Sequence, residues 1–155
     1  MIAPIMTEPG GEAWRQPTFH PFATTARLAR GEALDLRVEA PSYATARHGD
    51  VPLVTAAATV DDDGALAVFL TNRGDEVVEV EVAHAGAVVT LEQGRQMLAD
   101  REPAVAGPEH AAKVQRECWS TVDVARAVTP GSGGSTTIRL APESWTAFEG
   151  RLARA

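Results

Sequence analysis

The sequence predicts a mainly β protein, in which an antiparallel β-sandwich follows one short strand–loop–helix unit. After residue 31, short segments alternate apolar and polar residues and are separated by turn residues at regular intervals, as in an all-β sandwich or barrel. Before residue 31, an unbroken apolar run gives way to helical spacing. No internal repeat is visible, and a length of 155 residues favours one domain of ordinary composition.

The first 31 residues are expected to form a strand, a loop and a helix. IAPIMT at 2–7 is an apolar run that ends in Glu-Pro-Gly-Gly, which is typical of a buried strand entering a loop. Helical spacing follows over 18–30, and Gly31 is a natural stop. A single unit of this kind cannot bury both faces of its strand. We therefore expect 1–31 to belong to a larger α/β structure absent from this chain, and 32–155 to form the sandwich.

The strongest sandwich signal is a hairpin. LVTAAATV (53–60) and ALAVFLTN (65–72) flank an Asp-Asp-Asp-Gly turn, and an Asp-Gly step between two such segments is a good hairpin signal. EVVEVEVAH (76–84) alternates valine with glutamate, so one face of this strand is expected to pack and the other to meet water. ALDLRVEA (33–40) also alternates and is expected to be a strand.

The C-terminal half gives weaker signals. Strands are expected at 87–93, 95–99 and 120–128. Residues 100–120 are expected to form a long irregular loop with at most a turn of helix near His110. A closing hairpin is expected from 136–141 and 144–152, turned at Pro142-Glu143.

Composition excludes several classes of function. The net charge is −7 and Lys113 is the only lysine, so there is no basic surface for nucleic acid. No apolar run approaches the roughly 20 residues of a membrane helix. The N-terminus also lacks the features of a signal peptide, so we expect neither a membrane partner nor export, but a cytoplasmic location. Cys118 is the only cysteine and is expected to be a buried, inert residue.

Three stretches carry a family likeness. IAPIMTEPGGEAWRQPTFHPFATTARLARGEAL (2–34) resembles the end of the catalytic domain in α-L-arabinofuranosidases of glycoside hydrolase family 51, where the last strand of a (β/α)8 barrel enters a Gly-Gly loop, an Ala-Trp-Arg-Gln segment and a helix. Residues 50–73 and 140–152 are similar to the jelly-roll β-sandwich that follows the barrel. The chain departs from the family at 99–128, and His20 stands where tyrosine is more common.

The resemblance implies a role for one residue of the loop. In the family, the glutamine at the position of Gln16 helps to hold the arabinofuranosyl unit, and an amide offers sugar hydroxyls both a donor and an acceptor. The alternative is a glutamine that only stabilises the loop. Trp14 is expected to pack against the barrel rather than stack on sugar.

No catalytic residue is expected in this chain. Retaining glycosidases need two carboxyl groups about 5 Å apart. In the family both come from earlier barrel strands, and Glu8 matches neither, so it is expected to organise the loop with Arg15 as a candidate partner. The chain alone is therefore expected to be inactive.

No metal or cofactor is expected either. The serines and glycine pairs match no nucleophile elbow or phosphate loop, and an acidic stretch, 61–63, is expected to be a solvated turn. The histidines lack the spacing of metal ligands: His20, His48, His84 and His110.

Three functions follow. The first is a C-terminal portion of an α-L-arabinofuranosidase acting on arabinose-containing oligosaccharides, with a catalytic barrel or the subunits of a homo-oligomer as partner; Met1 then marks a start inside the barrel's last strand. The second is a free-standing carbohydrate-binding module, disfavoured because aromatic residues are 5% of the chain and Trp119 and Trp145 are expected to be isolated from each other. The third is an interaction module whose apolar surface, including Ile2, Ile5, Phe19 and Phe22, requires a partner.

Overall fold

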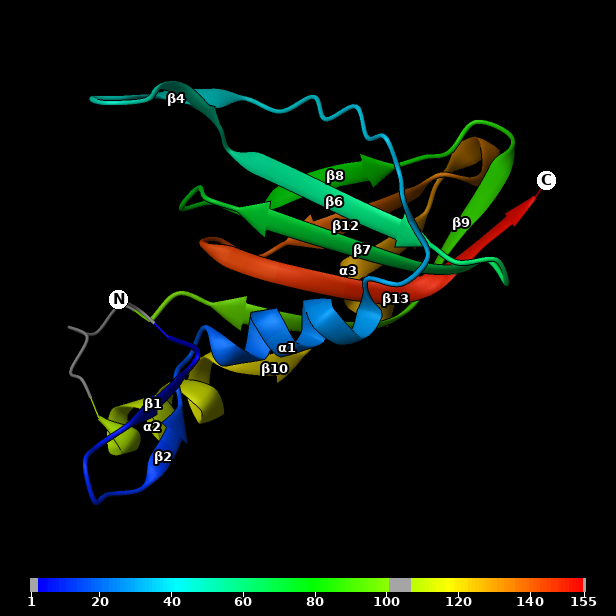
Figure 1. The fold of residues 1–155 in the computed structure, drawn as a ribbon. Helices are drawn as coiled ribbons and strands as arrows, with labels where there is room; N and C mark the ends of the chain where they lie inside the picture. Colours follow the sequence, from blue (N-terminus) through cyan, green and yellow to red (C-terminus); the bar gives the residue numbers. More distant parts are fainter. Residues whose placement is uncertain (1–2, 101–106, 155) are drawn as a thin grey trace.

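The computed structural model describes residues 3–100 and 107–154, and within them the chain forms a sandwich of two antiparallel sheets (Figure 1). The expectations for Met1, for Ile2 and for 101–106 lie outside the described residues. The larger sheet has six strands in the order β10-β9-β13-β7-β6-β3. Their bounds are β3 Glu32–Ala33, β6 Val54–Val60, β7 Ala65–Asn72, β9 Ala87–Leu98, β10 Trp119–Thr121 and β13 Ser144–Arg154.

A smaller, three-stranded sheet faces the larger one, and two hairpins and short helices surround them. The small sheet has the order β11-β12-β8, with β8 Val78–Val82, β11 Val128–Pro130 and β12 Thr136–Leu140. The hairpins are β1 Ile5–Thr7 with β2 Ala13–Arg15, and β4 Ser42–Thr45 with β5 Gly49–Pro52. The helices are α1 Phe19–Leu28, α2 Pro108–Cys118, α3 Val124–Ala127 and the 3-10 turn Ser132–Gly134.

The main core lies between the two sheets and is almost entirely aliphatic. Phe148, Ile138 and Leu140 are fully inaccessible to solvent. Alternate residues of β6, β7 and β9 meet the valines of β8 there, because successive side chains of a strand point to opposite faces. The predicted hairpin is confirmed as β6 and β7, and the predicted valine face of β8 packs against the core while its glutamates are exposed.

The N-terminal segment contains the predicted helix but also a hairpin that the sequence did not indicate. The helix predicted over 18–30 is confirmed as α1, and Gly31 follows it with φ of 73°. The strand predicted at 2–7 is the short β1, which pairs antiparallel with β2. The chain from Ile5 to Arg15 is therefore a hairpin, and the expected plain loop after the strand contains β2.

Three other segments differ from the sequence predictions. The alternating 33–40 segment pairs with β6 only at its start, as β3, and forms no strand beyond Ala33. The strands predicted on either side of Gly94 are one long strand, β9; its glycine permits the Phe148 ring to lie 2.8 Å from where a Cβ would be. The region 100–120 contains a true helix, α2, and the strand predicted at 120–128 is split into β10, α3 and β11.

The predicted closing hairpin is wrong because its two strands belong to different sheets. β12 pairs with β8 and β11, whereas β13 pairs with β7 and β9. Pro142-Glu143 is therefore a corner that carries the chain from one sheet to the other, and Glu143 adopts a φ of 45° there.

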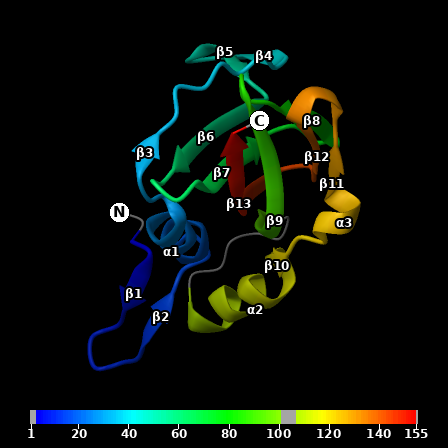
Figure 2. The same ribbon diagram turned by 90° about the vertical axis from the view of Figure 1, so that its right-hand side faces the viewer.

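The outer face of the six-stranded sheet is covered by α1. The helix lies on the side of this sheet away from β8 and β12 (Figure 2), with Leu28 packed against Ala67, Phe69 and Ala147. The sheet thus packs against a second sheet on one face and is partly covered by the N-terminal segment on the other. None of the described helices is long and apolar enough to cross a membrane.

Candidate functional site

The candidate site is the turn between β2 and α1, which contains Gln16. The Gln16 backbone N–H donates to the Pro4 carbonyl over 2.8 Å, and its own carbonyl accepts from the Phe19 N–H over 2.8 Å. Gln16 is thus fixed on one side to the hairpin and on the other to the first turn of α1. The side chain is half-buried and makes no hydrogen bond within the described part of the chain, so its amide is available to a ligand.

The polar residues around this turn do not pair as the sequence suggested. Arg15 lies opposite Ile5 in the hairpin, and its guanidinium stands 4.7 Å from the centre of the Phe19 ring. No ion pair joins Arg15 to Glu8 among the described residues, so the proposed pairing is wrong; Glu8 instead accepts the Gly11 N–H at its backbone carbonyl. Trp14 is half-buried, and its Nε1 is inaccessible to solvent with no acceptor in the described structure.

A continuous series of aromatic rings in contact, which we call the aromatic ladder, connects this turn to the sandwich. It consists of Phe19 and His20 of α1, Trp119 of β10, Trp145 of β13 and Phe69 of β7. The His20 ring stacks on Trp119 at 5.4 Å, Trp119 on Trp145 at 6.1 Å, and Trp145 on Phe69 at 6.2 Å. The expectation that Trp119 and Trp145 are isolated is therefore wrong.

Strand register explains why these two tryptophans meet. Trp119 and Trp145 are both Cα partners of Met97, on its two neighbouring strands, and directly opposed residues of a sheet point to the same face. The rings stack on one another in a half-buried layer that also holds His20, which is 8% exposed. An aromatic surface engaged in this way differs from the open platform of a sugar-binding module.

Burial changes the protonation of two groups near the ladder. Desolvation, and secondarily the positive charge of Arg15, lower the pKa of His20, so the stacked ring is neutral near pH 7. Burial, with the nearby carboxylates of Asp100 and Glu117, raises the pKa of the Cys118 thiol. Cys118 is therefore a protonated, unreactive residue at neutral pH, as the sequence predicted.

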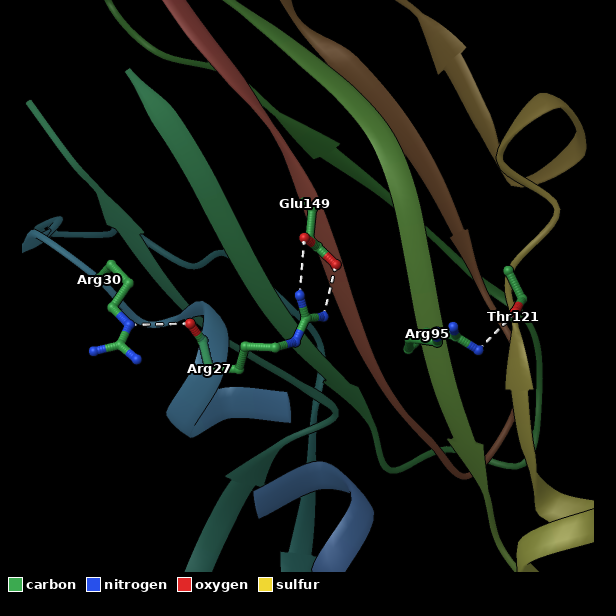
Figure 3. Close-up of polar contacts among 5 residues, drawn as sticks. All are labelled: Arg27, Arg30, Arg95, Thr121 and Glu149. Atoms are coloured by element: carbon green, nitrogen blue, oxygen red, sulfur yellow. Dashed lines mark hydrogen bonds and ion pairs between the residues drawn. The ribbon is translucent and has the colours of Figure 1, made fainter. Parts of the chain in front are cut away.

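Two polar contacts fix other points on the same face (Figure 3). Arg27, near the end of α1, donates two hydrogen bonds to the Glu149 carboxylate of β13, at 2.8 and 3.4 Å. Arg95 of β9 donates to Thr121 Oγ1 at 2.8 Å. Both guanidinium groups donate hydrogen bonds to other residues of the protein. On this face, Arg27 therefore attaches α1 to the sheet, and we do not take these arginines as a ligand-binding site.

A groove of about 810 Å³ opens between the two sheets, bounded by β6, β8 and the segment 34–41. Its floor consists of core side chains such as Val54, Val68 and Val80, and its charged residues lie on the segments that bound it. Such an apolar floor offers sugar hydroxyls no partners.

The four histidines lie on separate segments of the fold. His110 Nε2 lies 3.3 Å from Asp100 Oδ2, whereas His20 belongs to the aromatic ladder. Across residues 3–100 and 107–154, no three His, Cys, Asp or Glu side chains are grouped so that they could hold a metal ion.

Comparison with known proteins identifies the family. Residues 1–130 match the model of the α-L-arabinofuranosidase C-terminal domain. The chain belongs to this family. It is 38% identical over 153 residues to an intracellular exo-α-(1→5)-L-arabinofuranosidase of Streptomyces lividans and 36% identical over 151 residues to an exo-α-(1→6)-L-arabinofuranosidase of Bifidobacterium longum.

These matches cover nearly all of this chain but a small part of each relative. They span 96% and 95% of this chain, and 22% and 28% of the two relatives. A solved family 51 α-L-arabinofuranosidase from Bifidobacterium longum superposes with a TM-score of 0.77 at 27% identity, over 96% of this chain and 28% of that one. The mainly antiparallel β fold and the family 51 assignment are thus confirmed for this α-L-arabinofuranosidase C-terminal domain.

The sequence analysis identified the turn that contains Gln16, but it did not identify the aromatic ladder that connects this turn to the sandwich. Gln16 was found only through the resemblance, because nothing in the local sequence pattern distinguishes it from a glutamine that only stabilises the loop. The ladder was missed because Trp119 and Trp145 are far apart in the chain. A correct register for β9, β10 and β13 would have been the signal.

Proposed function

We propose that this chain works with a catalytic (β/α)8 barrel as a retaining α-L-arabinofuranosidase, which releases terminal non-reducing α-L-arabinofuranosyl residues from arabinose-containing oligosaccharides. The observation that carries the proposal is the match of residues 1–130 to the C-terminal domain of these enzymes. The names of the two relatives, exo-acting α-L-arabinofuranosidases, supply the reaction. The barrel contributes both catalytic carboxylates, and the isolated chain is inactive.

Within this assembly, residues 1–31 form the last element of the barrel and 32–155 the sandwich that braces it. Exposed apolar side chains on the N-terminal segment support this division. Ile5 is 53% and Phe22 65% exposed, and the buried Nε1 of Trp14 lacks an acceptor in the described structure. An apolar patch with an unsatisfied donor fits a surface that a partner covers.

Gln16 contacts the arabinofuranosyl unit in this proposal. Its amide is free of intramolecular hydrogen bonds in the described residues and its backbone is fixed on both sides, which suits a residue that holds a sugar hydroxyl. The partners are this substrate, the barrel and further subunits of a homo-oligomer. We place the enzyme in the cytoplasm because the Streptomyces lividans relative is named intracellular.

A chimaera tests the proposal. This chain replaces the segment that it matches in the Streptomyces lividans relative, and hydrolysis of an aryl α-L-arabinofuranoside is measured. We expect turnover by the chimaera and none by the 155-residue chain alone. A folded chimaera without activity, or activity of the isolated chain, contradicts the proposal.

The role of Gln16 is tested in the same chimaera. Gln16→Ala is expected to lower kcat/KM about fivefold, because one hydrogen bond to an uncharged group contributes on the order of 1 kcal/mol. Gln115→Ala, an exposed glutamine of α2, is the control and leaves kcat/KM unchanged. Equal rates for the two variants would show that Gln16 does not hold the substrate.

A further inference from the structure

The position of Gln16 depends on how the first turn of α1 is held. The Phe19 N–H donates to the Gln16 carbonyl and the His20 N–H donates to Pro17 at 3.3 Å, so Gln16 moves with this turn. The side chain of His20 is the part of the turn that faces the sandwich. Its ring is edge-on to Phe19 at 5.7 Å and stacked on Trp119 at 5.4 Å.

The helix is fastened to the sheet near both ends, by different kinds of contact. Near its C-terminal end, Arg27 binds Glu149 (Figure 3). Leu28 packs there against the cluster that contains Phe69. Near its N-terminal end, the described contact is the stack of His20 on Trp119. The first contact lies three turns of helix away from Gln16, and the second lies beside it.

Three residues of the ladder, Trp119, Trp145 and Phe69, are held in place by the strand pairing of the six-stranded sheet. Trp119 and Trp145 flank Met97 across three hydrogen-bonded strands, and Phe69, at the far end of the ladder, is 7% exposed. Stacked aromatic rings at such distances are restricted in tilt and offset. A change in the Trp119 ring is therefore transmitted to His20, and through His20 to the turn that carries Gln16.

We propose that Trp119 and Trp145, two residues of the sandwich, are positioning residues that set the place of Gln16 against the arabinofuranosyl unit. This inference rests on the proposed function. Neither tryptophan touches the sugar; both act through His20. The sandwich then does more than brace the barrel, because it fixes one wall of the substrate site.

The mechanical part of the proposal is tested on the chain itself by amide hydrogen exchange. Trp119→Leu is expected to increase exchange at the amides of Phe19 and His20 at least tenfold. Arg27→Gln loosens the other end of α1 and is the matched control, with its increase confined to the last turn of the helix. Unchanged exchange at Phe19 and His20 in Trp119→Leu would overturn the proposal.

The functional part is tested in the active chimaera by a double-mutant cycle. Trp119→Leu and Trp145→Leu are expected to lower kcat/KM severalfold, up to the loss seen in Gln16→Ala, because both act through Gln16 and small misplacements of a substrate-holding group are costly. Trp119→Phe retains a ring and restores most of the activity, and Arg27→Gln stays within twofold of the parent.

Non-additivity separates positioning from mere destabilisation. If Trp119 acts through Gln16, Trp119→Leu has little further effect on kcat/KM in the Gln16→Ala background. Full additivity in an active chimaera would overturn the positioning role while leaving the proposed function intact. An inactive parent chimaera would instead remove the proposed function, and this inference with it.

Discussion

The two faces of the six-stranded sheet are packed in different ways. The inner face meets β8 and β12 through aliphatic side chains and Phe148, in strands whose alternation is regular. The outer face meets α1 through stacked rings and an ion pair, contributed by segments far apart in the chain. The inner face is a core in the ordinary sense, whereas the outer face is a joint between the sandwich and the N-terminal segment.

The difference shows that stability and positioning are separated in this domain. Aliphatic burial is non-directional and roughly proportional to the apolar area removed from water. Stacked rings and bidentate ion pairs are directional, so they fix how one element sits on another. We therefore expect substitutions on the inner face to unfold the domain, and those on the outer face to displace α1 at a smaller cost.

The largest effect is expected at the centre of the inner face. Phe148→Ala removes a ring with 0% exposure and is expected to lower the free energy of unfolding by about 3–5 kcal/mol, measured by urea denaturation. Val77→Ala, at a side chain 49% exposed, is the control and stays within about 0.5 kcal/mol. A small loss for Phe148→Ala would mean that the inner face is not the main core.

The next effect is expected where α1 returns to the sheet. In Gly31→Ala, a methyl group would collide with the Val60 carbonyl and Asp61, at a φ of 73°. We expect a loss of about 2–4 kcal/mol, from left-handed strain and overpacking together. Gly10→Ala has almost the same φ, 74°, but open space around it, and is expected to lose only about 1–2 kcal/mol. Equal melting temperatures for the two variants would contradict this ranking.

A smaller effect is expected from pH. The pKa of His20 is lowered in the folded chain, whereas in the unfolded chain it lies near 6.5. Below about pH 6.5, His20 is therefore protonated more readily in the unfolded state than in the folded state. The free energy of unfolding keeps its full value above about pH 6.5 and declines as the pH falls below it. His20→Tyr keeps a ring and removes the titration. The difference in melting temperature between parent and His20→Tyr is expected to change between pH 7.5 and 5.5, and a constant difference would refute the assignment.

The smallest effect is expected from the ion pair of the outer face. Arg27 and Glu149 are 59% and 35% exposed, so a double-mutant cycle with Arg27→Gln and Glu149→Gln is expected to give a coupling energy below about 1 kcal/mol. High salt is expected to reduce this coupling. A value of several kcal/mol would show that the joint contributes to stability as much as the core does.

The fold was predictable where burial on one face imposes a period. The β6–β7 hairpin and the valine face of β8 followed from alternation, and α1 from helical spacing. Gly94 led to the wrong prediction of two strands, because a glycine inside a strand resembles a break. In the structure, this glycine lies within β9 and makes room for the Phe148 ring. Helix α2 was missed in a polar stretch, although its buried residues, Ala111, Val114 and Cys118, have helical spacing.

The site was predictable in a different and narrower sense. Gln16 came from the likeness of the loop to a known family, and its role as a sugar contact stays a prediction. The aromatic ladder could not be predicted from local sequence patterns. Trp119, Trp145 and His20 come into contact only through strand register and the packing of α1 on the sheet. Long-range pairings of this kind carry no signal in the residues next to them.

Strand β13 lies between β7 and β9 and pairs with both along most of its length. In chain order, however, β7 and β9 come well before it. During synthesis, β7 and β9 therefore leave the ribosome before β13 exists, and neither can yet pair with it or pack its apolar side chains against it. Such distant pairing is slow, and we expect nascent chains that end before Ser144 to depend on chaperones until the central strand arrives.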